Sequence, residues 1–308
     1  DCDVCLVGSE MCIRDRVNAM DSTLAVQLAI QGILLGGIYG LIALGLSLIF
    51  GVMGVINFAH GQMMVMAMYV SYWIFVLLGI DPYLSLVIVA AVIFVLGYVV
   101  QSSLVNRILD YPEAIQVLPL VSLGLVLENC ALLFWGPDHR SPQTALSLKT
   151  FWIGSVMIDV SRLIAFVLAI VITILIFVFL KKSNIGKCIR AAADNRTGAI
   201  LVGINVDRIN NTSFALGAAT TAAAGVLLLP LMPVSPHIGH DFTLTAFIVV
   251  ILGGMGNLMG ALVGGLILGV AESTSTLFLP ATLKQVVSFS ILIIIMLFRP
   301  QGLFGGKK

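Results

Sequence analysis

Apolar runs of about 20 residues follow one another along almost the whole chain, separated by short polar segments. A helix needs about 20 predominantly apolar residues to cross the hydrocarbon core of a membrane. The pattern therefore predicts an all-α, polytopic transmembrane helix bundle of about eight spans that forms a single domain over residues 20–308. The expected spans lie near residues 24–49, 58–78, 84–105, 115–135, 161–180 and 210–230, in a longer stretch at 242–274, and near 283–298.

The stretch 242–274 is interrupted by Gly253–Asn257, and both glycine and asparagine lower helix propensity. The distribution of Lys and Arg also requires a break, because short loops rich in these residues stay on the cytoplasmic side. The basic segment 181–208 and the C-terminal residues 299–308 are then both cytoplasmic, so 242–274 must cross as two segments. We predict a hairpin of two short helices, an external N-terminus and a cytoplasmic C-terminus.

The composition agrees with a membrane protein: 59% of the 308 residues are hydrophobic and 10% are charged, against about a quarter charged in soluble domains. The spans leave no room for a soluble enzyme domain. A formal net charge of +1 gives no electrostatic support for binding nucleic acid. The five cysteines form neither a disulfide framework nor a CxxC metal motif, so neither a metal nor a cofactor is expected.

Residues 1–19 precede the first apolar run and differ from the rest of the chain. They lack the basic segment and the following apolar segment of a signal peptide, and they have no amphipathic period. We expect a non-native or disordered leader, with a start at Met20 that places a short polar tip before the first span.

Polar and glycine residues interrupt the second span within Phe50–Met64, where apolar side chains are expected. Irregular backbone at membrane depth is tolerated only where it is buried in protein or lines a water-filled path. The break at 253–257 lies in the other half of the chain, and such paired interruptions indicate a transport site. The predicted translocation path is lined by Asn57, His60, Gly61, Gln62, Met64, Gly253, Gly254, Gly256 and Asn257. The evenly spaced glycines of 260–269 are interpreted as helix-packing contacts.

Glu128 and Glu272 are the acidic residues that lie well inside apolar surroundings. Each would cost about 2.5–3.5 kcal/mol at the centre of a lone helix, so both should face the protein interior or an interface. Glu272 ends its segment, which favours a solvated position. For Glu128 a neutral state, an ion pair and a proton relay all stay open. His237 and His240 are expected on the outer face, with a metal site as a minor alternative.

The chain shows no energy source of its own. A P-loop needs a glycine five residues before its Gly-Lys and a Ser or Thr after it; around Gly186-Lys187 these places hold Lys181 and Cys188. The segment 181–208 is basic, alanine-rich and periodic like a helix, so we expect a cytoplasmic partner to bind it and supply the energy. The 136–160 connection is expected to be the largest external feature, either a plain loop or a docking surface.

Several motifs resemble the inner-membrane permeases of ABC importers for branched-chain amino acids, of the LivH type. They are GVINFAHGQ at 54–62, IGKCIRAAADN at 185–195, LVGINVDR at 201–208, GAATTAAAGVLL at 217–228, ILGGMGNLMGALVGGLILGVAE at 251–272 and RPQGLFG at 299–305. The resemblance covers nearly everything from Ala25 to Gly305, whereas residues 1–19 have no counterpart in it.

The resemblance implies a multi-pass subunit of a heteromeric importer in the bacterial inner membrane, surrounded by membrane lipid. A second, related permease subunit, two cytoplasmic ABC ATPases and a periplasmic solute-binding protein are the implied partners. It also implies that a short coupling helix docks on an ATPase, with contacts from Arg190, Ala191, Ala192, Ala193, Asp194, Asn195, Ala199, Leu201, Gly203 and Ile204. The subunit itself would have no catalytic activity.

Three other functions stay open on the sequence. Related permeases import urea, short amides or other amino acids, and the motifs do not separate these solutes. A self-sufficient secondary carrier or channel would need no partner. An intramembrane enzyme would need His60 or Glu128 as an acid–base group, and no partner residue at a suitable spacing supports it. Homodimeric and heterodimeric pairing of the permease also stay open.

Overall fold

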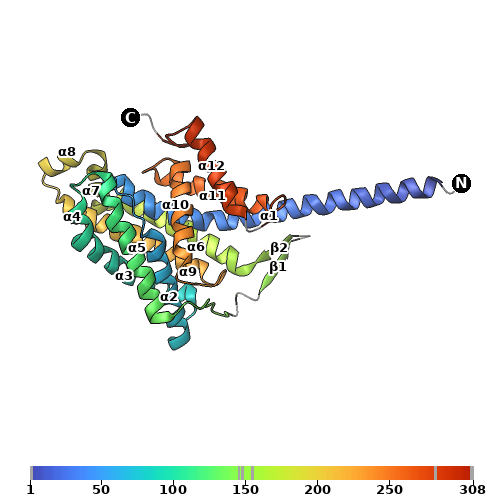
Figure 1. Cartoon of the computed structure of the whole chain (residues 1–308), viewed down its shortest axis with the longest axis horizontal. Helices are drawn as coiled ribbons and strands as arrows, with labels where there is room; N and C mark the ends of the chain where they lie inside the picture. Colours follow the sequence, from blue (N-terminus) through green and yellow to red (C-terminus); the bar gives the residue numbers. More distant parts are fainter. Residues whose placement is uncertain (1–2, 145, 147–148, 154–155, 281–282, 306–308) are drawn as a thin grey trace.

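The computed structural model describes residues 3–144, 146, 149–153, 156–280 and 283–305. Within these residues it is a helix bundle with one small β-hairpin (Figure 1). Seven helical segments are long and apolar enough to cross a membrane: 24–53, 60–78, 82–108, 114–135, 160–182, 206–228 and 258–275. Two shorter apolar helices, Ile238–Gly253 and Lys284–Phe298, complete the set. The predicted all-α polytopic bundle is confirmed, while the leader at 1–19 stays a prediction.

The elements follow the predicted order. They are α1 (Asp3–Met53), α2 (His60–Leu78), α3 (Pro82–Val100), the π-helix η1 (Gln101–Val105), α4 (Asn106–Ile108), α5 (Glu113–Trp135), β1 (Thr150–Ile153), β2 (Val156–Asp159), α6 (Val160–Lys182), α7 (Asn184–Asp194), α8 (Arg196–Leu201), α9 (Val206–Leu228), α10 (Ile238–Gly253), α11 (Leu258–Ser275) and α12 (Lys284–Phe298). Figure 1 places α7 and α8 at one end of the bundle and the β-hairpin at the other. We call these the α8 end and the β-hairpin end.

Helix α1 is the central element, because it contacts α6, α9, α10 and α11. Its glycines allow a very close approach to α11: a Cβ atom added at Gly36 would lie 2.7 Å from the carbonyl oxygen of Gly265. Gly269 packs against the backbone of α1 in the same way, at Gly32 and Gly36. The packing role predicted for the glycines of 260–269 is therefore confirmed. Small residues at a helix crossing let two backbones touch, which strengthens van der Waals contact in a membrane.

Helix α2 begins inside the bundle. After α1 ends, the chain turns at Gly54, whose φ of 68° is readily adopted by glycine, and residues 54–57 form no regular structure. His60 then opens α2 with its Nε2 3.0 Å from the carbonyl oxygen of Ile42, roughly 16 Å back along α1 from Met53. The predicted interruption of the second span is thus a stretch of irregular backbone at membrane depth.

The predicted break of the stretch 242–274 is also confirmed. Helix α10 ends at Gly253 and α11 begins at Leu258. Gly254 and Gly256 have φ angles of 98° and 80°, a region that disfavours side chains. The side chain of Asn257 then caps α11 by accepting a hydrogen bond from the backbone N–H of Gly260, at 3.0 Å.

The C-terminal segment returns to this turn. The backbone N–H of Leu303 donates to the carbonyl oxygen of Leu252 at 2.9 Å, and Asn257 Nδ2 donates to that of Phe304 at 3.0 Å. Phe304 also lines a cavity with Arg190 of α7. The basic segment 181–208, the turn 254–257 and residues 299–305 therefore share the α8 end, as the split of 242–274 requires.

Candidate functional site

Asn57 and His60, two residues of the predicted path, are buried at the irregular start of α2. Asn57 Oδ1 accepts a hydrogen bond from the backbone N–H of Ala59 at 3.0 Å. His60 Nε2 lies 2.6 Å from Thr221 Oγ1 of α9, in addition to its contact with Ile42. Both side chains are 0% exposed. Within this chain they fix where α2 begins, and their role in lining a path stays a prediction.

Gly61, Gln62 and Met64 tie the first turns of α2 to other helices. The backbone N–H of Gly61 donates to Thr243 Oγ1 of α10 at 3.0 Å, and Gly61 packs directly on the backbone of Gly239. Met64 packs against Gly225 of α9. The side chain of Gln62 points elsewhere, since its Nε2 donates to Glu128 Oε2 at 3.4 Å.

Glu128 of α5 holds two histidines at the start of α10. Its Oε1 lies 2.6 Å from His237 Nδ1, and its Oε2 lies 2.6 Å from His240 Nε2. The Glu128 side chain is 9% exposed, whereas those of His237 and His240 are 65% and 53% exposed. We call Gln62, Glu128, His237 and His240 the polar cluster. Of the alternatives left open for Glu128, the structure supports pairing, with His237 and His240 as the partners.

The polar cluster lies at membrane depth. Glu128 is roughly 10 Å along α5 from Trp135, the end of the span that begins at Ala114. Ionisable side chains are unfavourable against lipid and normally face the bundle interior or a water-filled cavity. The exposed side of His237 and His240 is therefore expected to meet water or another protein. No group of three or more His, Cys, Asp or Glu in the described chain is arranged to hold a metal ion.

The two halves of the predicted path do not meet. Gly61 touches α10 at Gly239 and Thr243, near its beginning. Gly253 ends the same helix, roughly 15 Å beyond Thr243. Gly254 packs against the C-terminal segment, and Gly256 approaches Gly51 at the end of α1. The predicted path residues thus form one group around the start of α2 and a second group at the α8 end, joined by α10.

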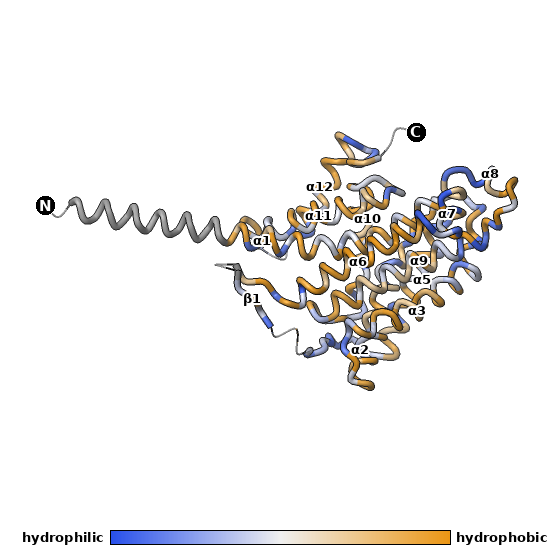
Figure 2. The backbone as a smooth tube through the Cα atoms, turned by 180° about the vertical axis from the view of Figure 1, so that it is seen from behind, coloured by the Kyte–Doolittle hydropathy of each residue, from blue (hydrophilic) through white to orange (hydrophobic). Residues whose placement is uncertain are grey.

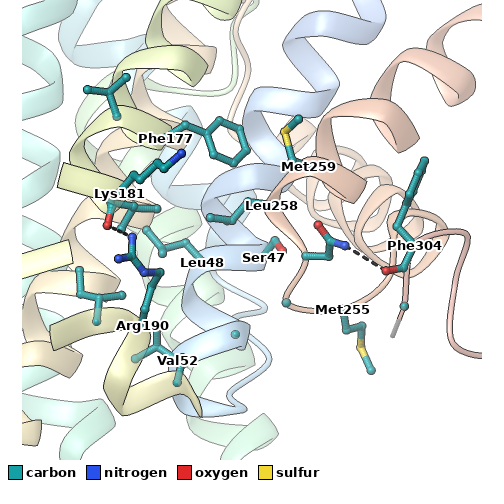
Figure 3. Close-up of a pocket in the computed structure, with 18 of the residues that line it drawn as sticks. Ser47, Leu48, Val52, Phe177, Lys181, Arg190, Met255, Leu258, Met259 and Phe304 are labelled. Atoms are coloured by element: carbon teal, nitrogen blue, oxygen red, sulfur yellow. Dashed lines mark hydrogen bonds between the residues drawn. The ribbon is translucent and has the colours of Figure 1, made fainter. Parts of the chain in front are cut away.

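Gly256 and Asn257, in the second group, line a cavity of about 710 Å³ (Figure 3). Phe177, Lys181 and Arg190 are on one side of this cavity and Met259 and Phe304 are on the other, in the view of Figure 3. We call it the α8-end cavity.

The predicted docking segment folds as consecutive short helices because polar side chains cap each one. Ser183 Oγ accepts from the backbone N–H of Gly186 at 2.9 Å at the start of α7. At the start of α8, Asn195 Oδ1 accepts a hydrogen bond from the backbone N–H of Gly198 at 2.8 Å. At the start of α9, Asn205 Oδ1 accepts one from the backbone N–H of Arg208. Ser and Asn are preferred at this position because they satisfy free backbone donors. Hydrophilic segments gather at this end of the bundle (Figure 2).

Burial divides the predicted coupling residues into two sets. Ala192 and Ala199 pack with Val206 in a small core of their own, so they support the segment from inside. The exposed members are Arg190, Ala191, Ala193, Asp194, Asn195, Leu201 and Gly203, and Ile204 is half-buried.

An apolar tip lies beside these exposed residues. Leu201 is 82% and Val202 is 77% exposed, and Ile200 is exposed as well. We define this tip as Ile200–Val202; Arg196 precedes it and Arg208 follows it in the sequence, and both are exposed. The tip lies within Ala199–Ile204, the range in which the resemblance predicts part of the ATPase contact, and that contact stays a prediction.

The expectation that Glu272 is solvated is wrong. Its side chain accepts hydrogen bonds from Tyr39 Oη of α1 at 3.0 Å and from Ser288 Oγ of α12 at 2.5 Å. The residue is 5% exposed. Two hydroxyl donors satisfy the carboxylate, which allows it to sit between α1, α11 and α12.

A family model described as branched-chain amino acid transport system / permease component matches residues 28–296. The chain is 32% identical over 295 residues to the high-affinity branched-chain amino acid transport system permease protein LivH of Salmonella typhimurium and to that of Escherichia coli, covering 91% of this chain and 95% of each relative. It is 31% identical over 293 residues to the corresponding permease protein BraD of Pseudomonas aeruginosa, with the same coverage. No solved structure matches the chain significantly.

Proposed function

The chain belongs to the family of permease components of branched-chain amino acid transport systems, and from this premise we propose a function for each part of the molecule. The chain is a transmembrane permease subunit of an ABC importer for branched-chain amino acids. It takes up a solute that a periplasmic binding protein releases, and cytoplasmic ATPases drive the passage. The single observation that carries this function is the family match, which spans residues 28–296 and so includes nearly the whole bundle.

The solute path runs along the face where the polar cluster is exposed, at the contact with a second, related permease subunit. This assignment rests on His237 and His240, which are half-exposed at membrane depth and need water or protein beside them. An amino acid carries an ammonium group, and the Glu128 carboxylate offers it a complementary charge. Asn57, His60 and Gly61 support that face from within, because they hold the start of α2 against α9 and α10.

The turn 253–257 acts at the other end of α10. Gly253, Gly254, Gly256 and Asn257 join α10, α11 and the C-terminal segment with few side-chain atoms between them. A shift of this turn would move α10 as a rigid rod, since helices transmit displacement along their axis. His240 lies in the first helical turn of α10. A shift of residues 253–257 would therefore also move His240 and the polar cluster.

Energy enters through α7 and α8. The apolar tip and the exposed coupling residues Ala191, Ala193, Asp194, Asn195 and Gly203 dock on one of two cytoplasmic ABC ATPases, with Arg196 and Arg208 complementing acidic groups around an apolar pocket. An exposed apolar patch with a polar rim is typical of a protein interaction site, and charge complementarity sets its register. The chain itself then needs no nucleotide site.

The basic segment 181–208 supports a proposed orientation in the inner membrane, because short loops rich in Lys and Arg stay on the cytoplasmic side. The α8 end and the C-terminus are cytoplasmic, while the N-terminus and the β-hairpin are periplasmic. Trp152, on β1 of the hairpin, is 63% exposed and is available to a periplasmic partner.

Reconstitution tests the function. In proteoliposomes that contain the chain with its second permease, ATPase and binding-protein partners, we expect leucine uptake that requires internal ATP and external binding protein. The chain alone should move no leucine. Uptake by the purified chain alone, driven by an ion gradient, would show that it is a self-sufficient carrier.

A further inference from the structure

The α8-end cavity is mainly apolar. It opens between α1, α6, α7, the turn 254–257 and the C-terminal segment. Its volume of about 710 Å³ is in the range of pockets that hold small ligands, roughly 300–1,000 Å³. The apolar wall is formed by Leu48, Val52, Phe177, Val178, Leu180, Ile189, Met255, Leu258, Met259 and Phe304.

Three cations stand at the rim of this cavity. Lys181 and Lys182 end α6, and Arg190 lies on α7; Figure 3 shows Lys181 and Arg190 on the same side of the cavity. The guanidinium of Arg190 donates to the carbonyl oxygen of Leu180, which holds it beside the end of α6. No Asp or Glu lines the cavity, and none of the ion pairs within the described residues involves these three side chains. The rim therefore carries uncompensated positive charge.

The cavity is open to the lipid side of α6. Val178, which lines the cavity about one turn before Lys181, is 45% exposed, and Leu175, about one turn further into the span, is 61% exposed. Lys181 and Lys182 lie in the last turn of a membrane span, at the level where lysine side chains extend toward lipid headgroups. The apolar wall continues from that level into the hydrocarbon region along Leu48 and Phe177 (Figure 3).

We propose that the α8-end cavity binds an anionic phospholipid. The phosphate lies between Lys181, Lys182 and Arg190, and an acyl chain lies against Leu48 and Phe177. Basic pockets between transmembrane helices bind the headgroups of anionic lipids for the same reason. A soluble anion would leave the apolar wall uncovered, and a purely apolar ligand would leave the cations without a counter-charge.

The bound lipid joins two elements that move in the proposed transport cycle. Arg190 belongs to α7, and Met255 and Asn257 belong to the turn between α10 and α11. A lipid that contacts both would hold them together. The binding itself does not depend on the transport function, so the site can be tested on this chain alone.

The test uses the full chain in nanodiscs of phosphatidylcholine doped with phosphatidylglycerol, followed by native mass spectrometry of the lipids retained in mild detergent. Each cation near an anionic headgroup strengthens binding about fivefold, so Lys181→Gln with Lys182→Gln should weaken phosphatidylglycerol retention on the order of 25-fold. The matched control is Lys187→Gln, which removes the same charge from α7; Lys187 does not line the α8-end cavity but an adjoining hollow that shares Arg190 and also contains Asp194. This control should retain the lipid as the unmodified chain does.

A second measurement locates the acyl chain. Phosphatidylglycerol with a photoreactive acyl chain should label peptides that contain Leu48 and Phe177. Equal loss of lipid in the Lys187→Gln control would reveal a general surface attraction and overturn the proposal. Labelling confined to other helices, or displacement of the lipid by inorganic phosphate alone, would overturn it as well. So would unchanged retention in the double variant.

Discussion

Replacing Glu128 by Gln tests whether the polar cluster takes part in solute passage. The substitution keeps the shape of the side chain but removes the negative charge between His237 and His240. A hydrogen bond to a charged group contributes about 1.5–3 kcal/mol, against about 0.5–1.5 kcal/mol between neutral groups. Glu128 makes two such contacts, both at 2.6 Å. Replacing two charged hydrogen bonds by two neutral ones would therefore cost about 2 kcal/mol if the cluster were fully buried.

Solvent screening reduces this energetic cost, because the side chains of His237 and His240 are 65% and 53% exposed. We therefore expect a loss of about 1 kcal/mol for the interactions of the cluster. If the Glu128 charge stabilises the passing ammonium group by a similar amount, leucine uptake should slow about fivefold. The folded state should persist, since Gln can still accept and donate at the same place.

The assay is initial leucine uptake in proteoliposomes that contain all partners, with ATP hydrolysis measured in parallel. Asp241→Asn is the matched control: its carboxylate is exposed one residue from His240 and contacts Gln285 instead of the cluster. We expect Asp241→Asn to transport normally. Normal uptake by a well-folded Glu128→Gln variant, or an equal defect in both variants, would refute a role of the cluster in passage.

Two further predictions concern the packing that supports the site. Gly36→Leu should lower the free energy of unfolding of the purified chain by about 1–3 kcal/mol, because the new Cβ would meet backbone atoms of α11 at 2.7 Å. Gly124→Ala, whose Cβ would have its nearest contact at 3.6 Å, should be tolerated in the same melting experiment. Tyr39→Phe should cost about 1–3 kcal/mol in detergent unfolding, because buried Glu272 loses one of its two donors; an unchanged midpoint would mean that water replaces the hydroxyl.

The sequence predicted the spans well because membrane insertion imposes a strong pattern of long apolar runs. The break at 253–257 was predictable for a local reason, since glycines at positive φ end a helix wherever they occur. The same local chemistry made the interruption at 54–62 visible. Each of these features depends on residues that are close together in the chain.

The polar cluster was not predictable, because it depends on distant residues. Glu128 and His237 are 109 positions apart, and they meet only in the folded bundle, where α2 contacts both α5 and α10. Burial in the predicted docking segment depends in part on contacts between α7, α8 and α9. Ala192 and Ala199 pack together with Val206 in a small core, and their part in an ATPase contact stays a prediction.

In the proposed function, energy from ATP enters this permease through α7 and α8. The most direct test is the number of leucine molecules taken up per ATP hydrolysed by the reconstituted transporter with Leu201→Asp, which puts a charge on the apolar tip. Thr197→Asp adds the same charge at an exposed polar position of α8 and serves as the control. We expect Leu201→Asp to abolish ATP-driven uptake while the subunit still inserts, and we expect Thr197→Asp to remain coupled. An unchanged ratio of uptake to hydrolysis in Leu201→Asp would contradict it.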